Sequence, residues 1–312
     1  MVNFFSIYKP LLHGALKLVG MTTQAVEIEP GTVLNFWLPT ETTKKMKNKT
    51  SKPAVVFLHG FAMDGILNWQ FQVLALANKY AVYVPDFLFF GGSITDRPER
   101  TVEFQSECMA KGLRKLGVEK CTVVGLSYGG MVGFKMAEMY PELVESMVVS
   151  CSVMALTESV SNTGLQRIGF SSWAEFLLPK TVEGVRTLFD IGSCNLPKVP
   201  KFICEDILEA MFDHRKERSE LLEALVISDE KFSIPHYPQK IYLLWGENDV
   251  IFDMETARNL KDLKLCRQGG EKATLMAIQK AGHLVNLERP FVYNKHLKTI
   301  LASLTLDKCH NN

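Results

Sequence analysis

The sequence lacks the features that mark several special classes of protein. It has no uninterrupted run of about 20 apolar residues, the length that a membrane-spanning helix needs. Lys and Arg total 35 against 34 for Asp and Glu, a net charge of +1, so charge gives no reason to expect a nucleic-acid partner. A hydrophobic content of 47% argues against a disordered chain. The composition therefore indicates an ordinary globular protein.

The cysteines show no spacing typical of a disulfide framework or a metal site. The seven cysteines are odd in number and scattered, with no C-x-x-C pair and no Cys/His spacing typical of zinc sites. A chain of this kind is expected to keep its thiols reduced, as in the cytoplasm. We therefore predict a cytoplasmic protein that needs no metal and no other cofactor.

The first 22 residues are apolar but interrupted. Lys9, Pro10, His13 and Lys17 break the stretch MVNFFSIYKPLLHGALKLVGM, which leaves no continuous apolar core of a signal peptide. Six apolar side chains fit one face of a short helix: Leu11, Leu12, Ala15, Leu16, Leu18 and Val19. We predict an amphipathic helix over 1–22 that either packs on the protein or contacts a membrane surface peripherally.

The rest of the chain alternates between strands and helices. The segments AVEIE and TVLNFWL flank a Pro-Gly turn and predict a hairpin. Short valine-rich runs such as PAVVFL, AVYVPD and CTVVGL then alternate with helical segments, as strands covered on both faces do. The rhythm stops over 153–235, which has amphipathic segments and no convincing strand. We predict a mostly parallel, doubly wound α/β sheet from residues 23–152 and 236–312, with a helical cap at 153–235.

A serine stands at the end of one predicted strand. Gly125-Leu126-Ser127-Tyr128-Gly129 fits the pattern G-x-S-x-G, with the strand CTVVGL before it and a helix after it. Glycines two residues on either side let a strained turn approach its neighbours closely. This context predicts that Ser127 is a nucleophile.

A serine hydroxyl needs a general base and a group that orients the base. The segment YLLWGENDVIF places Asp249 beyond a later strand, and MAIQKAGHLVNLERP places His283 after the strand that follows. Glu247 and Asp253 compete for the acid role, although Asp253 is typical of a helix N-cap. The other histidines considered lie inside a helix or in charged or proline-flanked segments: His214, His236 and His296.

Acyl transfer at a serine also requires two backbone N–H groups for the oxyanion. Tyr128, directly after the nucleophile, is expected to supply one, and Phe61 in VVFLHGFAMDG the other. We expect Gly60 to let the backbone turn in beside the serine. His59 is expected to hold this loop and to transfer no proton.

Taken together, these segments resemble the α/β-hydrolase superfamily over about residues 25–305. The matching segments are FLHGF, YVPDFLFFGGS, GLSYGG, LLWGENDVI and AGHLVNLERP. The chain looks like plant-type cap-containing hydrolases close to monoacylglycerol lipases and carboxylesterases, and like bacterial hydrolases of carbon–carbon bonds in meta-cleavage products. One departure is Phe89-Phe90-Gly91, where relatives often have Gly-Phe-Gly, which puts the loop and pocket shape in question.

The resemblance implies a serine hydrolase that cleaves a carboxylic ester of a small to medium apolar substrate. Haloalkane dehalogenases and epoxide hydrolases of this fold carry aspartate where this chain has Ser127. Three alternatives use the same residues: a carbon–carbon bond hydrolase, an acyltransferase and a ligand receptor with little turnover. Apolar cap residues are expected either to line the pocket or to form the cap's own core: Trp173, Phe176, Leu177, Leu178, Phe189, Met211 and Phe212. The oligomeric state stays open.

Overall fold

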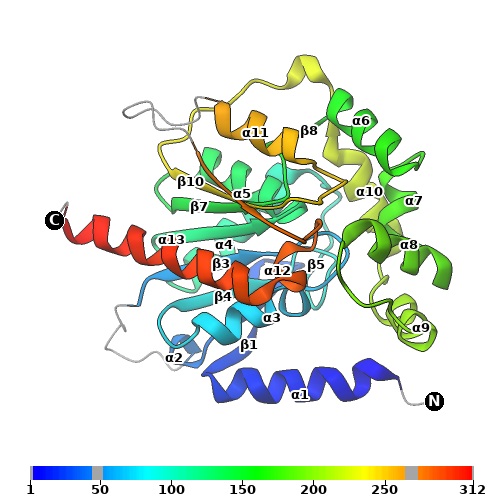
Figure 1. Cartoon of the computed structure of the whole chain (residues 1–312). Coiled ribbons are helices and arrows are strands. Elements are labelled where there is room, and N and C mark those ends of the chain that lie inside the picture. The colour runs from blue at the N-terminus through cyan, green and yellow to red at the C-terminus, as the bar shows by residue number, and fades with distance from the viewer. Residues whose placement is uncertain (1–2, 44–51, 264–272, 311–312) are drawn as a thin grey trace.

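The computed structural model describes residues 3–43, 52–263 and 273–310, with side chains in the last segment described to residue 306 (Figure 1). A nine-stranded sheet runs through this part of the chain in the order β1-β2-β4-β3-β6-β7-β10-β11, with β5 against β2. The strands are β1 (Met21–Glu29), β2 (Thr32–Pro39), β3 (Ala54–Leu58), β4 (Ala81–Pro85), β5 (Ile94–Thr95), β6 (Cys121–Leu126), β7 (Val144–Ser150), β10 (Lys240–Gly246) and β11 (Thr274–Ile278).

The sheet is antiparallel at one edge and parallel elsewhere. The predicted hairpin is confirmed, since β1 and β2 pair antiparallel, and β2 is also antiparallel to β4. From β4 to β11 every neighbouring pair is parallel. All six residues of β6 are buried, as its apolar sequence predicts for a strand covered on both faces. The predicted fold class is confirmed.

Helices cover both faces of this sheet (Figure 1). Helices α3 (Gly65–Leu76) and α13 (Pro290–His310) pack on each other on one face, and α4 (Val102–Lys115) and α5 (Tyr128–Met139) on the other. Shorter elements complete the core: α2 (Thr40–Thr43), α11 (Met254–Asp262) and α12 (Val285–Glu288). Because parallel strands end at the same edge, the loops after β3, β6, β10 and β11 come together there.

The insertion between β7 and β10 is mainly helical and lies to one side of the sheet (Figure 1). It contains α6 (Glu158–Ile168), α7 (Trp173–Leu177), α8 (Val182–Gly192), α9 (Lys201–Ala210), α10 (Arg215–Leu225) and the 3-10 turn η1 (Asp229–Lys231). The expectation that this stretch has no strand is wrong. Strands β8 (Leu156–Thr157) and β9 (Val226–Ile227) pair parallel and join its two ends, but two residues are too short to produce an alternating pattern. The division into core and cap stays a prediction.

The N-terminal helix α1 (Phe4–Leu18) packs on the protein along one face. Leu12 and Leu16 are buried, whereas Ile7, Leu11 and Leu18 are exposed. The Phe4 amide donates a hydrogen bond of 2.6 Å to Asp206 of α9, so this helix contacts the cap as well as the core. Peripheral membrane contact through the exposed face stays a prediction. None of the helices described has both the length and the apolar character needed to cross a bilayer.

Five of the seven cysteines have described side chains, and none of these five forms a disulfide. Four of them are buried: Cys108, Cys121, Cys151 and Cys204. Cys266 and the side chain of Cys309 lie outside the part described. The reduced state of the thiols and the cytoplasmic location both stay predictions.

Candidate active site

Ser127 lies on a sharp turn between β6 and α5. Its φ of 53° and ψ of −119° are strained for a residue with a side chain. The turn is held by hydrogen bonds to the Ser127 carbonyl from the Gly130 amide at 2.8 Å and from the Ser152 hydroxyl at 2.7 Å. The backbone therefore presents the hydroxyl at the N-terminus of α5, on the side of the cap.

The glycines beside Ser127 are required by the space around them. A Cβ at Gly125 would lie 2.5 Å from the carbonyl oxygen of Gly129, and one at Gly129 would lie 2.2 Å from that of Leu58. A Cβ at Gly130 would meet the Ser152 hydroxyl at 2.5 Å. These distances are shorter than any real side chain adopts, so the turn, strand and helix can approach only without side chains at these positions.

The structure brings Asp249 and His283 together from two loops. His283 Nδ1 lies 3.0 Å from Asp249 Oδ2, and both residues are buried. The other carboxylate oxygen accepts hydrogen bonds from the amides of Ile251 at 2.8 Å and Phe252 at 3.1 Å. These bonds fix the carboxylate in the orientation that holds the Nδ1–H tautomer of His283. The Nε2 atom is thereby left to act as a base.

The two competing acids lie in other surroundings than Asp249. Asp253 caps α11 by accepting from the Thr256 amide at 2.9 Å, as predicted, and forms an ion pair of 2.7 Å with Arg167 of the cap. Glu247 is exposed to solvent. Neither side chain is paired with His283, whereas Asp249 is.

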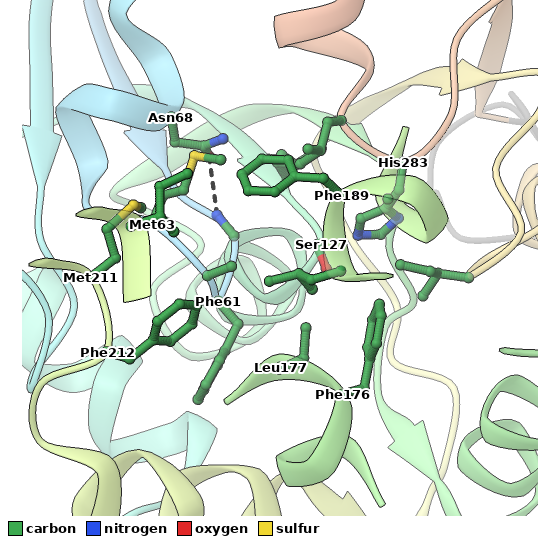
Figure 2. A pocket seen from close by; sticks show the side chains of 18 residues that line it. Phe61, Met63, Asn68, Ser127, Phe176, Leu177, Phe189, Met211, Phe212 and His283 are labelled. Atoms are coloured by element: carbon green, nitrogen blue, oxygen red, sulfur yellow. Dashed lines mark hydrogen bonds between the residues drawn. The ribbon is translucent and has the colours of Figure 1, made fainter. Parts of the chain in front are cut away.

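Ser127 and His283 line one cavity between core and cap, where Figure 2 shows the hydroxyl on the side of the imidazole. Among the described hydrogen bonds, none joins the two side chains. Such contacts are often loose in sites without substrate and tighten in the complex. The structure thus brings the three predicted catalytic residues into one site, while their catalytic role stays a prediction.

The loop that carries His283 is tied to the cap. Glu288 accepts hydrogen bonds from the Gly282 amide at 2.7 Å and from the Cys194 and Asn195 amides at 2.8 Å each. The Leu284 amide donates to the carbonyl of Gly192 at 2.9 Å, at the end of α8. Movement of this part of the cap would therefore disturb the position of the imidazole.

The two amides expected to bind an oxyanion lie beside the serine. Tyr128 is the first residue of α5, and Phe61 lines the same cavity as Ser127. Within the described part of the chain, neither amide donates a hydrogen bond. Both are therefore available to a developing negative charge at the positive end of the helix.

The expectation for Gly60 is wrong. Its φ is not in the left-handed region, and a Cβ placed there would lie no closer than 3.8 Å to any neighbour. The nearest atoms include Cβ of Ser127. The backbone lies beside the serine but has no need of glycine at this position, because a Cβ would make only ordinary contacts there.

His59 has the structural role that its position predicts. It is fully buried, with Nδ1 2.7 Å from the Gly60 carbonyl, and its Nε2 accepts from the Phe87 amide at 3.0 Å. An amide N–H can only donate, so Nε2 carries no proton and the ring is neutral. Burial lowers the pKa of His59 from 6.5 to about 4. This neutral ring joins the loop after β3 to the loop after β4.

The loop Phe89-Phe90-Gly91, where the sequence departs from Gly-Phe-Gly, keeps a backbone conformation typical of glycine. Phe89 has a φ of 73°, in the left-handed region that favours glycine. Its carbonyl accepts a hydrogen bond of 2.8 Å from the buried guanidinium of Arg218, which lies over the Phe90 ring at 4.1 Å. The phenylalanine ring faces Arg100 at 4.6 Å and does not line the cavity. The departure therefore places an aromatic ring against Arg100, and this ring is not part of the cavity wall.

The cavity continues on both sides of Ser127 as two apolar lobes. Phe61, Phe176, Leu177 and Ile251 line both lobes together with Ser127 and His283. Of the seven apolar cap residues considered above, six line one lobe or the other, and Leu178 is buried without lining either. Figure 2 shows Phe176, Leu177, Phe189, Met211 and Phe212 around the serine. The cap thus supplies most of an apolar wall.

Among the described residues, one group has metal-ligand geometry. The ligand atoms of Cys151, Asp249 and His283 lie within 4.8 Å of one another. Two of these residues already hydrogen-bond to each other, and burial raises the pKa of the Cys151 thiol, which disfavours the thiolate that a metal binds. The group is therefore explained by the Asp249–His283 pair.

Sequence reasoning did not find Ser152 or Glu288, which hold the serine turn and the histidine loop. It also did not find Asn68, a buried residue of α3 that lines the cavity. Glu288 lies within the matching segment AGHLVNLERP, but the role of each of the three residues depends on a contact that only the folded chain creates. Asn68 is one of three polar residues of α3, beside Gln70 and Gln72, so the sequence alone does not single it out.

Comparisons with known proteins agree with this architecture. Residues 53–185 match a family model described as the alpha/beta hydrolase fold. Epoxide hydrolase 1 of Caenorhabditis elegans is 24% identical over 287 residues, covering 80% of this chain and 65% of the worm protein. The chain thus spans slightly less than two thirds of that relative.

Two solved structures extend the likeness to nearly the whole chain. A protein of Acinetobacter baumannii AYE described as a lipase superposes with a TM-score of 0.80 at 18% identity, covering 96% of this chain and 97% of that one. The 2-hydroxy-6-oxo-6-phenylhexa-2,4-dienoate hydrolase of Rhodococcus gives 0.70 at 21% identity, covering 89% and 97%. With the sheet order and the turn at Ser127, these likenesses define the class: the chain has the α/β-hydrolase fold.

Proposed function

We propose that this protein is a serine hydrolase that cleaves carboxylic esters of small to medium, uncharged apolar substrates, as a carboxylesterase or a monoacylglycerol lipase does. The observation that carries the proposal is the Asp249–His283 hydrogen bond of 3.0 Å beside a serine on a strained turn, in an apolar cavity. A paired base and a presented nucleophile are the parts that acyl transfer needs.

The mechanism follows from these positions. His283 Nε2 takes the proton of Ser127 while Oγ attacks the ester carbonyl, and the oxyanion is bound by the amides of Phe61 and Tyr128. Asp249 stabilises the imidazolium, which returns the proton to the leaving alcohol. Water activated by the same imidazole then cleaves the acyl-enzyme, releasing the acid and the free serine.

Epoxide hydrolysis, the activity in the name of the worm relative, does not fit a serine nucleophile at this turn. Attack of Ser127 Oγ on an epoxide carbon would form an alkyl ether, which has no carbonyl for water to attack. A carboxylate nucleophile forms an ester that water can cleave, but this chain has serine at that position. The chemistry of the nucleophile therefore favours acyl substrates.

Carbon–carbon bond cleavage of a dienoate is also disfavoured. A dienoate carries a carboxylate, and a buried carboxylate needs a cation or several hydrogen-bond donors. The residues lining the two lobes include no Lys and no Arg. A neutral ester places no charge in these apolar lobes.

A panel of substrates tests the proposal. The protein is expected to hydrolyse p-nitrophenyl esters of two to eight acyl carbons and to leave epoxides and a dienoate unchanged. Adding acceptor alcohols and analysing the products separates hydrolysis from acyl transfer, because a transferase would form a new ester. Stoichiometric release without turnover would instead indicate a receptor, and faster cleavage of the dienoate would indicate a carbon–carbon hydrolase.

A further inference from the structure

One polar side chain in the cavity has no part in the mechanism above. Of the 18 residues that line the larger lobe, three carry polar side chains: Ser127, His283 and Asn68. Ser127 and His283 carry out the acyl chemistry. Asn68, in the second turn of α3, lies in a wall that is otherwise apolar and is 2% exposed.

The orientation of the Asn68 carboxamide follows from its neighbours. The Gly60 amide lies 3.1 Å from Oδ1 (Figure 2), and an amide N–H can only donate, so the oxygen faces Gly60 and Nδ2 points the other way. The Asn68 carbonyl accepts from Asn286 Nδ2 at 2.7 Å, and its amide donates to the Asp64 carbonyl at 3.1 Å. Asn68 is therefore held firmly between the loop of Phe61 and the segment that follows His283.

The nitrogen of this carboxamide has no hydrogen-bond partner among the residues that the structure describes. Nδ2 is not one of the fully buried side-chain atoms without a partner, so it keeps accessible surface, and an N–H group in an apolar wall favours binding an acceptor. In a cavity that receives the substrate, the substrate can supply it.

We propose that Asn68 is a specificity-determining residue whose Nδ2 donates a hydrogen bond to a substrate oxygen other than the scissile carbonyl oxygen. The substrate class is then an uncharged ester whose acyl or alcohol part carries an ether, carbonyl or hydroxyl oxygen within the larger lobe. This inference rests on the proposed ester hydrolase function.

Two pairs of esters that differ by replacement of one CH₂ with oxygen test it. One pair is 2-methoxyethyl and butyl butanoate, and the other is ethyl 4-methoxybutanoate and ethyl hexanoate. After correction for alkaline hydrolysis rates, the wild-type protein is expected to prefer the ether in one pair by about tenfold in kcat/KM, the worth of one hydrogen bond. Asn68→Asp keeps an acceptor for the Gly60 amide but removes the donor, and should abolish this preference or favour the hydrocarbon ester. Asn259→Asp, on the exposed surface of α11, adds the same charge and should leave the preference unchanged.

The results separate this inference from the function on which it rests. Turnover of all four esters without an ether preference would overturn the role of Asn68, and this wild-type result needs no variant to fold. A preference that survives in Asn68→Asp would overturn it as well. If wild-type protein cleaves none of the esters and binds no fluorophosphonate, the proposed function itself fails.

Discussion

At the scale of single residues, the site depends on which positions are free of side chains. Gly125, Gly129 and Gly130 face backbone or hydroxyl groups so closely that a methyl group has no room. Gly60 has room for one. All four glycines lie within three residues of a predicted site residue, Phe61 or Ser127. Only the three glycines around Ser127 are required by the fold.

Replacing these glycines should therefore have unequal effects. Gly129→Ala places Cβ against the Leu58 carbonyl oxygen, and we expect it to lower the free energy of unfolding by about 3 kcal/mol or more. Gly60→Ala, the matched control, should change it by less than about 1 kcal/mol. Urea unfolding followed by circular dichroism measures both. Equal stability of the two variants would contradict the close approach at the turn.

The oxyanion site is predicted to act through backbone atoms. In Phe61→Ala the amide remains, while the ring that packs on Phe90 and Tyr128 is lost. We expect kcat on p-nitrophenyl butyrate to stay within about tenfold of wild type and KM to rise, because the ring lines both lobes. Ser127→Ala should lose on the order of 10³-fold or more. A Phe61→Ala variant as inactive as Ser127→Ala would argue for a role of the side chain.

At the scale of elements, the cap decides what reaches the serine. The larger lobe measures about 60 Å³, room for only a few water molecules, so we expect a substrate of medium size to shift wall side chains. Met63 and Met211 lie in this wall (Figure 2), and methionine adapts its shape more readily than branched residues do. Helix α7 contributes Phe176 and Leu177 to both lobes.

Helix α7 also offers a matched pair of variants. Leu177→Ala enlarges both lobes, and we expect the acyl chain length with the highest kcat/KM to increase by about two carbons. Leu178→Ala removes the same atoms from a buried neighbour that lines neither lobe, so it should reduce stability without shifting the optimum. The p-nitrophenyl ester series measures this optimum. A shift in Leu178→Ala alone would contradict the described cavity wall.

The sequence predicts the elements better than their contacts. The hairpin, the parallel strands and the start of α5 at Tyr128 follow from apolar periodicity and glycine placement, which are local properties. The pairing of β8 with β9 and the bond from Ser152 to the serine turn involve positions far apart along the chain. The order of Ser127, Asp249 and His283 could be predicted because it is a pattern, whereas the roles of Asn68 and Glu288 depend on contacts that no pattern specifies.

At the scale of the whole molecule, buried titratable groups link the active-site loops to overall stability. His59 joins the loops after β3 and β4 as a neutral ring with a pKa near 4, against 6.5 in water. Between pH 4 and pH 6.5, the unfolded chain therefore binds more protons at His59 than the folded chain does. The contribution of neutral His59 is complete above pH 6.5 and is lost as the pH falls toward 4.

This linkage predicts a pH-dependent difference between wild type and His59→Gln. The unfolding free energy of wild type minus that of the variant should increase from pH 4.5 to pH 7. The slope is at most about 1.4 kcal/mol per pH unit, so the total increase is at most about 3 kcal/mol. Asp86, whose pKa is raised mainly by burial, is present in both proteins, so its opposite contribution largely cancels. Urea titrations at several pH values measure the difference. A difference that is constant across this range would show that His59 titrates normally.

We predict above all that His283 and Asp249 activate Ser127 as a nucleophile. Labelling with a fluorophosphonate probe, followed by mass spectrometry of the modified peptide, tests it most directly. We expect wild-type protein to be labelled at Ser127, Ser127→Ala to be unlabelled, and His283→Ala to react at least 10²-fold more slowly. Circular dichroism should show all three proteins folded. A folded wild type that is not labelled, or equal labelling of His283→Ala, would show that His283 does not activate Ser127.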